Sequence, residues 1–266
     1  MTRISVAFER LMSENRTGLV PFVTAGDPDL RRTVAILQAL AEAGADIVEI
    51  GVPFSDPLAD GPVIQRASER ALRSGTTLRG TLDMVATARR LLDVPIVLFS
   101  YANPIWRMGV PEFVDRAAEA GVDGVLVLDV PVEEAEELRV PIRNAGLDMI
   151  FLVSPTSTRE RIRRAQQRGS GFLYAISRLG VTGARRSLAE GVEELVGRIR
   201  LEGDLPIAVG FGISIPDHVR EVGRYADAAV IGSALVNVIA GAAELPDMVA
   251  RVARFVSALK DGTNRS

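Results

Sequence analysis

The chain has 266 residues, of which 47% are hydrophobic, and a formal net charge of −3. Acidic and basic residues are interspersed, so the sequence lacks the basic footprint of a nucleic-acid-binding protein. It contains no cysteine and one histidine, which excludes disulfides, thiol nucleophiles and metal sites built from several histidines.

The N-terminal segment 1–16 has an amphipathic pattern with charges and lacks the continuous apolar core of a signal peptide. The most apolar stretch, 228–243, is interrupted by polar residues and is too short to span a bilayer. We therefore expect a cytoplasmic protein with no membrane partner. The single histidine, His218, lies in a helical pattern, and we expect it at the helix surface.

Short apolar runs rich in β-branched residues alternate with amphipathic helical segments along the whole chain. Most runs are continuously apolar, which is typical of parallel strands covered on both faces. The expected strands lie near 18–24, 46–50, 95–101, 124–129, 148–153, 171–176, 206–210 and 227–232. Expected helices include the N-terminal segment, 30–43, 62–74, 111–120, 133–145, 158–167 and 234–241.

Capping residues support these boundaries. Left-handed C-terminal residues are expected at Gly44, Gly121 and Gly146. N-caps are expected at Thr77, Thr158 and Ser214. Eight strands alternating with helices predict a (β/α)8 TIM barrel with extra helices, as a single domain over 1–266. A doubly wound open sheet is the alternative.

Two carboxylates stand at the expected second strand and its following loop. Glu49 lies between Val48 and Ile50, so if these face the helices, Glu49 faces the barrel axis near Phe22. Burial there should raise its pKa towards the range of a group that both gives and takes protons. Asp60 can approach the same space, and we expect a more solvated setting that keeps it ionised. The pair suits general acid/base chemistry, whereas a structural ion pair for Glu49 and a turn role for Asp60 are the alternative.

Glycine-rich segments follow the last three expected strands, at 177–183, 209–214 and 230–236. In TIM barrels the loops after strands seven and eight and the N-terminus of a short helix form a phosphate site. Gly212, Gly232 and Ser233 fit such a site, although glycines also serve in tight turns. The long loop from Ser177 to about Gly191 suggests a lid that excludes water, with a disordered loop as the alternative. The proline of YANP (101–104), together with Pro57 and Pro131 in other expected loops, suggests stiff, exposed rim loops.

Together, several segments resemble the tryptophan synthase alpha chain family over nearly the whole length. The matching segments are FVTAGDP (22–28), EIGVPFSDPLADGP (49–62), YANP (101–104), GVDGVLVLDVPVEE (121–134), SRLGVTGAR (177–185), GFGIS (210–214) and IGSALV (231–236). The acidic segment is the most specific of these, whereas GFGIS and IGS occur more widely among phosphate-binding barrels.

The resemblance implies a retro-aldol cleavage of indole-3-glycerol phosphate to indole and glyceraldehyde 3-phosphate. It implies that Glu49 is the acid/base at indole C3 and the glycerol hydroxyl, and that Asp60 holds the indole N–H. The implied substrate-binding residues are Phe22, Tyr101, Leu126, Tyr174, Thr182, Gly183, Phe211, Gly212, Gly232 and Ser233.

The resemblance also implies a partner, the beta chain of an α2β2 heterotetramer, to which indole would pass. Pyridoxal phosphate is expected only in that beta chain, and no cofactor or metal in this one. The positions implied to lie near the partner are Asp56, Pro57, Asn103 and Pro131. Two alternatives stay open: a stand-alone lyase that releases indole, and a catalytically silent regulatory subunit. A phosphosugar isomerase of histidine biosynthesis is disfavoured, because the first strand ends in Thr24 and Ala25 without an aspartate.

Overall fold

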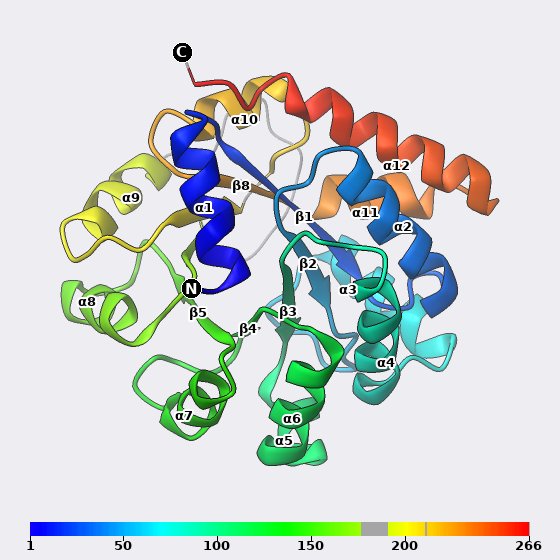
Figure 1. Cartoon of the computed structure of the whole chain (residues 1–266), viewed down its shortest axis with the longest axis horizontal. Helices are drawn as coiled ribbons and strands as arrows, with labels where there is room; N and C mark the ends of the chain where they lie inside the picture. Colours follow the sequence, from blue (N-terminus) through cyan, green and yellow to red (C-terminus); the bar gives the residue numbers. More distant parts are fainter. Residues whose placement is uncertain (177–190, 211, 266) are drawn as a thin grey trace.

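Eight parallel strands close into a barrel in sequential order, with β8 pairing back onto β1 (Figure 1). The computed structural model describes residues 1–176, 191–210 and 212–265. The strands are β1 (Gly18–Thr24), β2 (Val48–Gly51), β3 (Ile96–Ser100), β4 (Gly124–Val127), β5 (Asp148–Val153), β6 (Leu173–Ile176), β7 (Ile207–Gly210) and β8 (Ala228–Ile231). The predicted TIM barrel is confirmed, and the open-sheet alternative is wrong because the sheet is closed.

Helices surround the barrel and cover its outer face (Figure 1). Within the described ranges they are α1 (Arg3–Ser13), α2 (Leu30–Glu42), α3 (Pro62–Arg73), α4 (Leu78–Arg89), α5 (Ala102–Met108), α6 (Val110–Ala120), α7 (Glu136–Asn144), α8 (Arg159–Arg168), α9 (Val192–Arg200), α10 (Pro216–Val222), α11 (Ser233–Ala240) and α12 (Leu245–Lys260). The expected extra helices correspond to α1, α3 and α11. The segment after Tyr101 is helix α5 rather than the expected loop.

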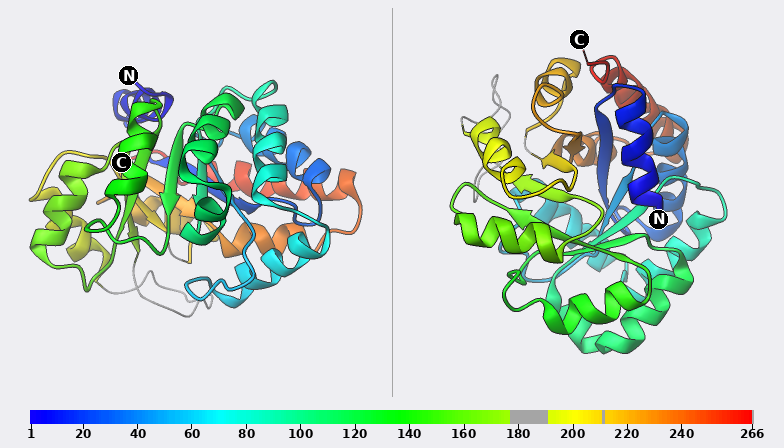
Figure 2. Two further views of the ribbon diagram at one scale, coloured as in Figure 1. Left: turned by 90° about the horizontal axis from the view of Figure 1, so that it is seen from below. Right: turned by 60° about the vertical axis from the view of Figure 1, so that its left-hand side comes forward.

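Helix α1 closes the end of the barrel at which the strands begin. Its buried residues Ile4, Phe8 and Leu11 join the cluster of inward-facing strand residues. The rings of Phe8 and Phe172 lie 5.6 Å apart between centroids. Figure 2 shows α1 lying across this end of the barrel.

Most predicted caps are confirmed. The Thr77 and Thr158 hydroxyls accept backbone N–H groups at the starts of α4 and α8. Gly44, Gly121 and Gly146 have positive φ angles of 99°, 81° and 79°. A positive φ is what a helix C-terminus needs from glycine.

Two predictions around α10 are wrong. The helix is preceded by Ile215 without a side-chain cap, so Ser214 is not its N-cap. His218 is buried rather than at the helix surface. The Ser214 N–H donates to Nδ1 of His218 at 3.4 Å, so the imidazole accepts a backbone hydrogen bond from the loop before the helix.

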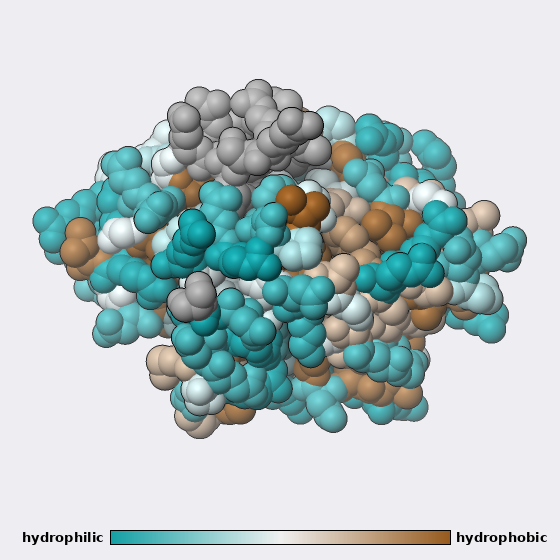
Figure 3. Space-filling model, turned by 90° about the horizontal axis from the view of Figure 1, so that it is seen from above, coloured by the Kyte–Doolittle hydropathy of each residue, from teal (hydrophilic) through white to brown (hydrophobic). Residues whose placement is uncertain are grey.

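Figure 3 shows one face of the molecule, on which hydrophilic side chains predominate and a more apolar region lies to the right of the centre. In the part of the chain that the structure describes, no helix combines the length and apolar character needed to cross a membrane.

Candidate active site

A cavity of about 520 Å³ opens at the carboxyl ends of the strands. Its volume lies within the range of small-molecule sites, roughly 300–1,000 Å³. It is lined by Phe22, Glu49, Ala59, Asp60, Gly61, Val63, Ile64, Phe99, Tyr174, Gly210, Gly212, Ile213, Ser214, Val230, Gly232, Ser233, Ala234 and Asn237. Both predicted catalytic carboxylates are in this lining.

Glu49 faces the barrel interior from β2, beside Phe22 of β1 in the strand register. Its exposed fraction is 1%, and neither carboxylate oxygen has a hydrogen-bond partner among the described residues. Burial, and then the nearby charge of Asp60, raise the pKa of Glu49 to about 8. This carboxyl is therefore mostly protonated at neutral pH. Because no hydrogen-bond or ionic partner contacts it among the described residues, the structural ion pair is not present there.

Asp60 approaches from the loop between β2 and α3 and is half-buried. Burial raises its pKa to about 6, against the opposing effect of a hydrogen bond from Tyr101. The expected solvated setting is therefore wrong, because the loop lies against the cavity and against β3. The pKa of Asp60 is nonetheless lower than that of Glu49, so at pH 7 Asp60 is mainly ionised and Glu49 mainly protonated.

Aromatic rings form the wall around the two acids. Phe22 and Phe99 meet edge to face, with centroids 5.6 Å apart. Glycines make room for these rings, because a Cβ on Gly51 would lie 2.5 Å from Cζ of Phe22. A Cβ on Gly210 would likewise collide with the hydroxyl of Tyr174.

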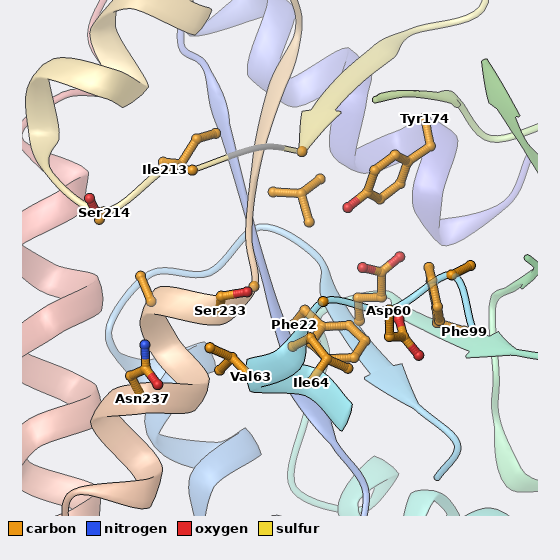
Figure 4. A pocket seen from close by; sticks show the side chains of 18 residues that line it. Phe22, Asp60, Val63, Ile64, Phe99, Tyr174, Ile213, Ser214, Ser233 and Asn237 are labelled. Carbon is orange, nitrogen blue, oxygen red and sulfur yellow. The ribbon is translucent and has the colours of Figure 1, made fainter. Parts of the chain in front are cut away.

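The far end of the cavity is built from the segments after β7 and β8. Figure 4 shows Asp60, Phe99 and Tyr174 on one side and Ile213, Ser214 and Ser233 on the other. Helix α11 begins there at Ser233 and has no side-chain cap. The N–H groups of such a first turn favour an anion.

Gly212, with a φ of +64°, Gly232 and Ser233 all line this end, where the sequence predicts a phosphate site. Three other predicted residues, Thr182, Gly183 and Phe211, lie outside the described residues, as does the predicted lid apart from Gly191.

Two predicted substrate-binding residues do not line the cavity. Leu126 is fully buried among the inward-facing residues of the barrel. Tyr101 lies behind Asp60 and donates its hydroxyl hydrogen to that carboxylate. By contrast, Tyr174 lines the cavity as predicted, and burial followed by the charges of Glu49 and Asp60 raises its pKa well above the usual value.

The predicted partner-facing residues are accessible on segments that follow β2, β3 and β4. Asp56, Asn103 and Pro131 are exposed, and Pro57 is half-buried. Because these strands are neighbours, the four residues belong to the same rim of the barrel.

The sequence reasoning missed several residues of the lining. Val63 and Ile64 lie in the first turn of α3, and Asn237 lies one turn into α11. An apolar pair directly after the acidic loop was a usable signal for the first two. Nothing in the sequence pattern marked Asn237. No group of three or more potential metal ligands occurs within residues 1–176, 191–210 and 212–265.

Comparisons with known proteins agree on one family. The family model described as "Tryptophan synthase alpha chain" matches residues 8–264. The chain is 51% identical over 263 residues to the tryptophan synthase alpha chain of Geobacter sulfurreducens, covering 98% of each. It is 47% identical over 262 residues to that of Solibacter usitatus, again covering 98% of each.

Solved structures show the same likeness. Tryptophan synthase subunit alpha from Legionella pneumophila superimposes with a TM-score of 0.91 at 37% identity, covering 98% of each chain. A structure of Mycobacterium tuberculosis tryptophan synthase gives a TM-score of 0.91 at 37% identity, covering 100% of this chain and 99% of the other.

Proposed function

The chain belongs to the tryptophan synthase alpha chain family, and we propose that Glu49 and Asp60 carry out the reaction of that family in the cavity described above. That reaction is the cleavage of indole-3-glycerol phosphate to indole and glyceraldehyde 3-phosphate. The observation that carries the proposal is a pair of carboxyls that line one cavity in different surroundings. Glu49 is buried without a hydrogen-bond partner among the described residues, and Asp60 is half-buried and accepts a hydrogen bond from Tyr101.

Glu49 supplies both proton transfers. Its protonated carboxyl gives a proton to C3 of the indole ring, which turns the ring into a cationic leaving group. The resulting carboxylate then takes the proton from the glycerol hydroxyl next to the breaking bond. The electron pair of that O–H becomes the new carbonyl bond, and the C–C bonding pair returns to the ring. A pKa of about 8 suits a group that gives and takes protons near neutral pH.

Asp60 stabilises the positive charge that the ring carries between these steps. Its ionised carboxylate accepts the indole N–H, which becomes more acidic as C3 is protonated. A negative group placed in advance beside developing positive charge lowers the barrier without further reorganisation.

The phosphate of the substrate belongs at the opposite end of the cavity. Backbone N–H groups at Gly212, Gly232 and Ser233 would hold it, with the dipole of α11 favouring its negative charge. Thr182, Gly183 and Phe211 are proposed to complete this end and the cover above it. The apolar middle, formed by Phe22, Phe99 and neighbouring residues, then receives the indole ring.

We further propose that the rim formed by Asp56, Pro57, Asn103 and Pro131 contacts a beta chain in an α2β2 assembly. Their accessibility on the segments that follow the neighbouring strands β2, β3 and β4 supports this, because the cavity opens at the same ends of the strands. Pyridoxal phosphate would then belong to the beta chain alone.

The test is the release of indole from indole-3-glycerol phosphate, measured with and without a tryptophan synthase beta chain. Removal of a positioned proton-transfer group typically costs about 10²–10⁴-fold in rate. We expect Glu49→Gln to lose turnover on that scale while still binding the substrate. Near-normal turnover in this variant would contradict the role of Glu49. Equal rates with and without the beta chain would favour the stand-alone lyase, and no cleavage in either case would favour the silent subunit.

A further inference from the structure

Tyr101 hydrogen-bonds to the loop between β2 and α3, which carries Asp60. Its hydroxyl donates to Oδ2 of Asp60 at 3.1 Å and accepts the N–H of Ala59 at 3.1 Å. One oxygen atom therefore holds both the carboxylate and the backbone that precedes it. Tyr101 itself is absent from the lining of the cavity, so it acts on the site through Asp60.

Tyr101 is itself held rigidly. Its exposed fraction is 5%, and its ring packs on Phe54 with centroids 4.9 Å apart. The Ser100 hydroxyl donates to the Tyr101 carbonyl at 2.9 Å, and the Ala102 N–H donates to Oδ1 of Asp129 at 2.8 Å. The phenol is thus fixed by β3, by the start of α5 and by the segment after β4.

The other hydrogen bonds of Asp60 involve its backbone. The Asp60 N–H donates to the Pro57 carbonyl at 3.0 Å, and the Gln65 amide of α3 donates to the Asp60 carbonyl at 2.9 Å. Within the described ranges, the Tyr101 hydroxyl is the only group that hydrogen-bonds to the Asp60 carboxylate. Among the described residues, the direction of that carboxylate therefore depends on one phenol.

We propose that Tyr101 is a positioning residue for the cleavage reaction, whose hydroxyl aims the Asp60 carboxylate into the cavity. The inference rests on the proposed function, and it replaces the substrate contact that the sequence resemblance implies for Tyr101. A carboxylate held before the substrate arrives needs no reorientation as charge develops on the ring.

The titration of Asp60 reports this role. Among the described residues, the charged or titratable groups around it are Glu49 from β2, Tyr174 from β6 and Tyr101, which directly follows β3, with Asp129 acting on Tyr101. A hydroxyl that donates to a carboxylate favours its charged form. Loss of that hydroxyl must therefore raise the pKa of Asp60, while the other groups stay in place.

The test is Tyr101→Phe, which keeps the ring on Phe54 and removes only the hydroxyl. We expect kcat to fall about tenfold or more at pH 7, the scale of a hydrogen bond to a charged group. KM should stay within about twofold because Tyr101 does not line the cavity. The acidic limb of the kcat/KM profile should move up by about one pH unit.

Two further variants make the result specific. Tyr225→Phe removes a hydroxyl between α10 and β8, outside the cavity lining, and should leave kcat, KM and the pH profile unchanged. In an Asp60→Asn background, Tyr101→Phe should have almost no further effect on kcat, because both changes remove one interaction. An additive loss in the double variant would overturn the proposal.

A rise in KM with an unmoved acidic limb would overturn it in favour of a direct substrate contact. An unchanged profile with kcat within twofold would show that the hydroxyl does nothing for the reaction. The pKa of Asp60, measured by carboxyl NMR on the protein without ligand, separates this inference from the proposed function. It should be higher in Tyr101→Phe even if the wild type does not cleave indole-3-glycerol phosphate, and an equal value would refute the inference alone.

Discussion

Replacement of Glu49 by Gln should stabilise the fold while it removes the chemistry. The carboxyl is 1% exposed, has no hydrogen-bond partner among the described residues, and has a pKa of about 8 against an ordinary value of 4.5. An unfolded chain ionises this group at neutral pH, whereas the folded chain keeps it protonated. Folding must therefore take up a proton, which lowers stability as the pH rises from 4.5 to about 8.

The magnitude follows from the two pKa values. Each pH unit between them is worth about 1.4 kcal/mol, so the penalty is about 3 kcal/mol at pH 7. Below pH 4.5 the glutamic acid is protonated in both states and the penalty vanishes. Glutamine has nearly the shape of the protonated acid and does not titrate, so Glu49→Gln should remove the pH-dependent penalty without introducing a different one.

The assay is urea unfolding of wild type and Glu49→Gln at several pH values from 4 to 8. We expect nearly equal free energies of unfolding at pH 4 and a variant more stable by about 3 kcal/mol at pH 7. Glu119→Gln, at an exposed position of α6, is the matched control and should show no such dependence. A constant difference between wild type and Glu49→Gln across the pH range would refute the reasoning, because it would show that Glu49 does not titrate abnormally.

Three further predictions concern the surroundings of the two acids. Gly51→Ala should cost about 1–3 kcal/mol of stability and lower activity, because its Cβ would lie 2.5 Å from Cζ of Phe22; an unchanged melting temperature would contradict this. Ser233→Asp should raise KM about 100-fold without destabilising the fold, because a carboxylate suits the start of α11 but repels phosphate; unaltered KM would exclude this end as the phosphate site. Asp27→Asn should lower the free energy of unfolding by about 1–2 kcal/mol in urea, since buried Asp27 makes two 2.7 Å bonds to Arg70, and equal stability would show that this pair contributes nothing.

The alternation of apolar runs and amphipathic helices predicted the barrel because both periodicities are local. A strand covered on both faces must be apolar, and the βα unit then repeats with little choice of topology. The alternation of side chains along a strand also predicted the direction of Glu49, because a residue between Val48 and Ile50 faces the opposite side of the strand from them.

Residues whose environment depends on distant segments were predicted less well. His218 was expected at the surface, yet it is buried and accepts the N–H of Ser214. Helix periodicity predicts which face of a helix is apolar, but it does not predict which side chain accepts a hydrogen bond from the preceding loop. Similarly, the proline of YANP suggested a loop, whereas Pro104 lies in the first turn of α5, a place that proline tolerates well.

The sequence by itself determined the strand order, the barrel and the inward direction of Glu49, because these follow from short-range alternation and from chain connectivity. Only the tertiary structure decided the surroundings of Asp60. Asp60 is half-buried and accepts a hydrogen bond from Tyr101, which directly follows β3 and lies 41 residues further along the chain. No local sequence pattern predicts this tertiary contact, because the electrostatic environment of a loop carboxyl is set by the residues that the completed fold packs against it.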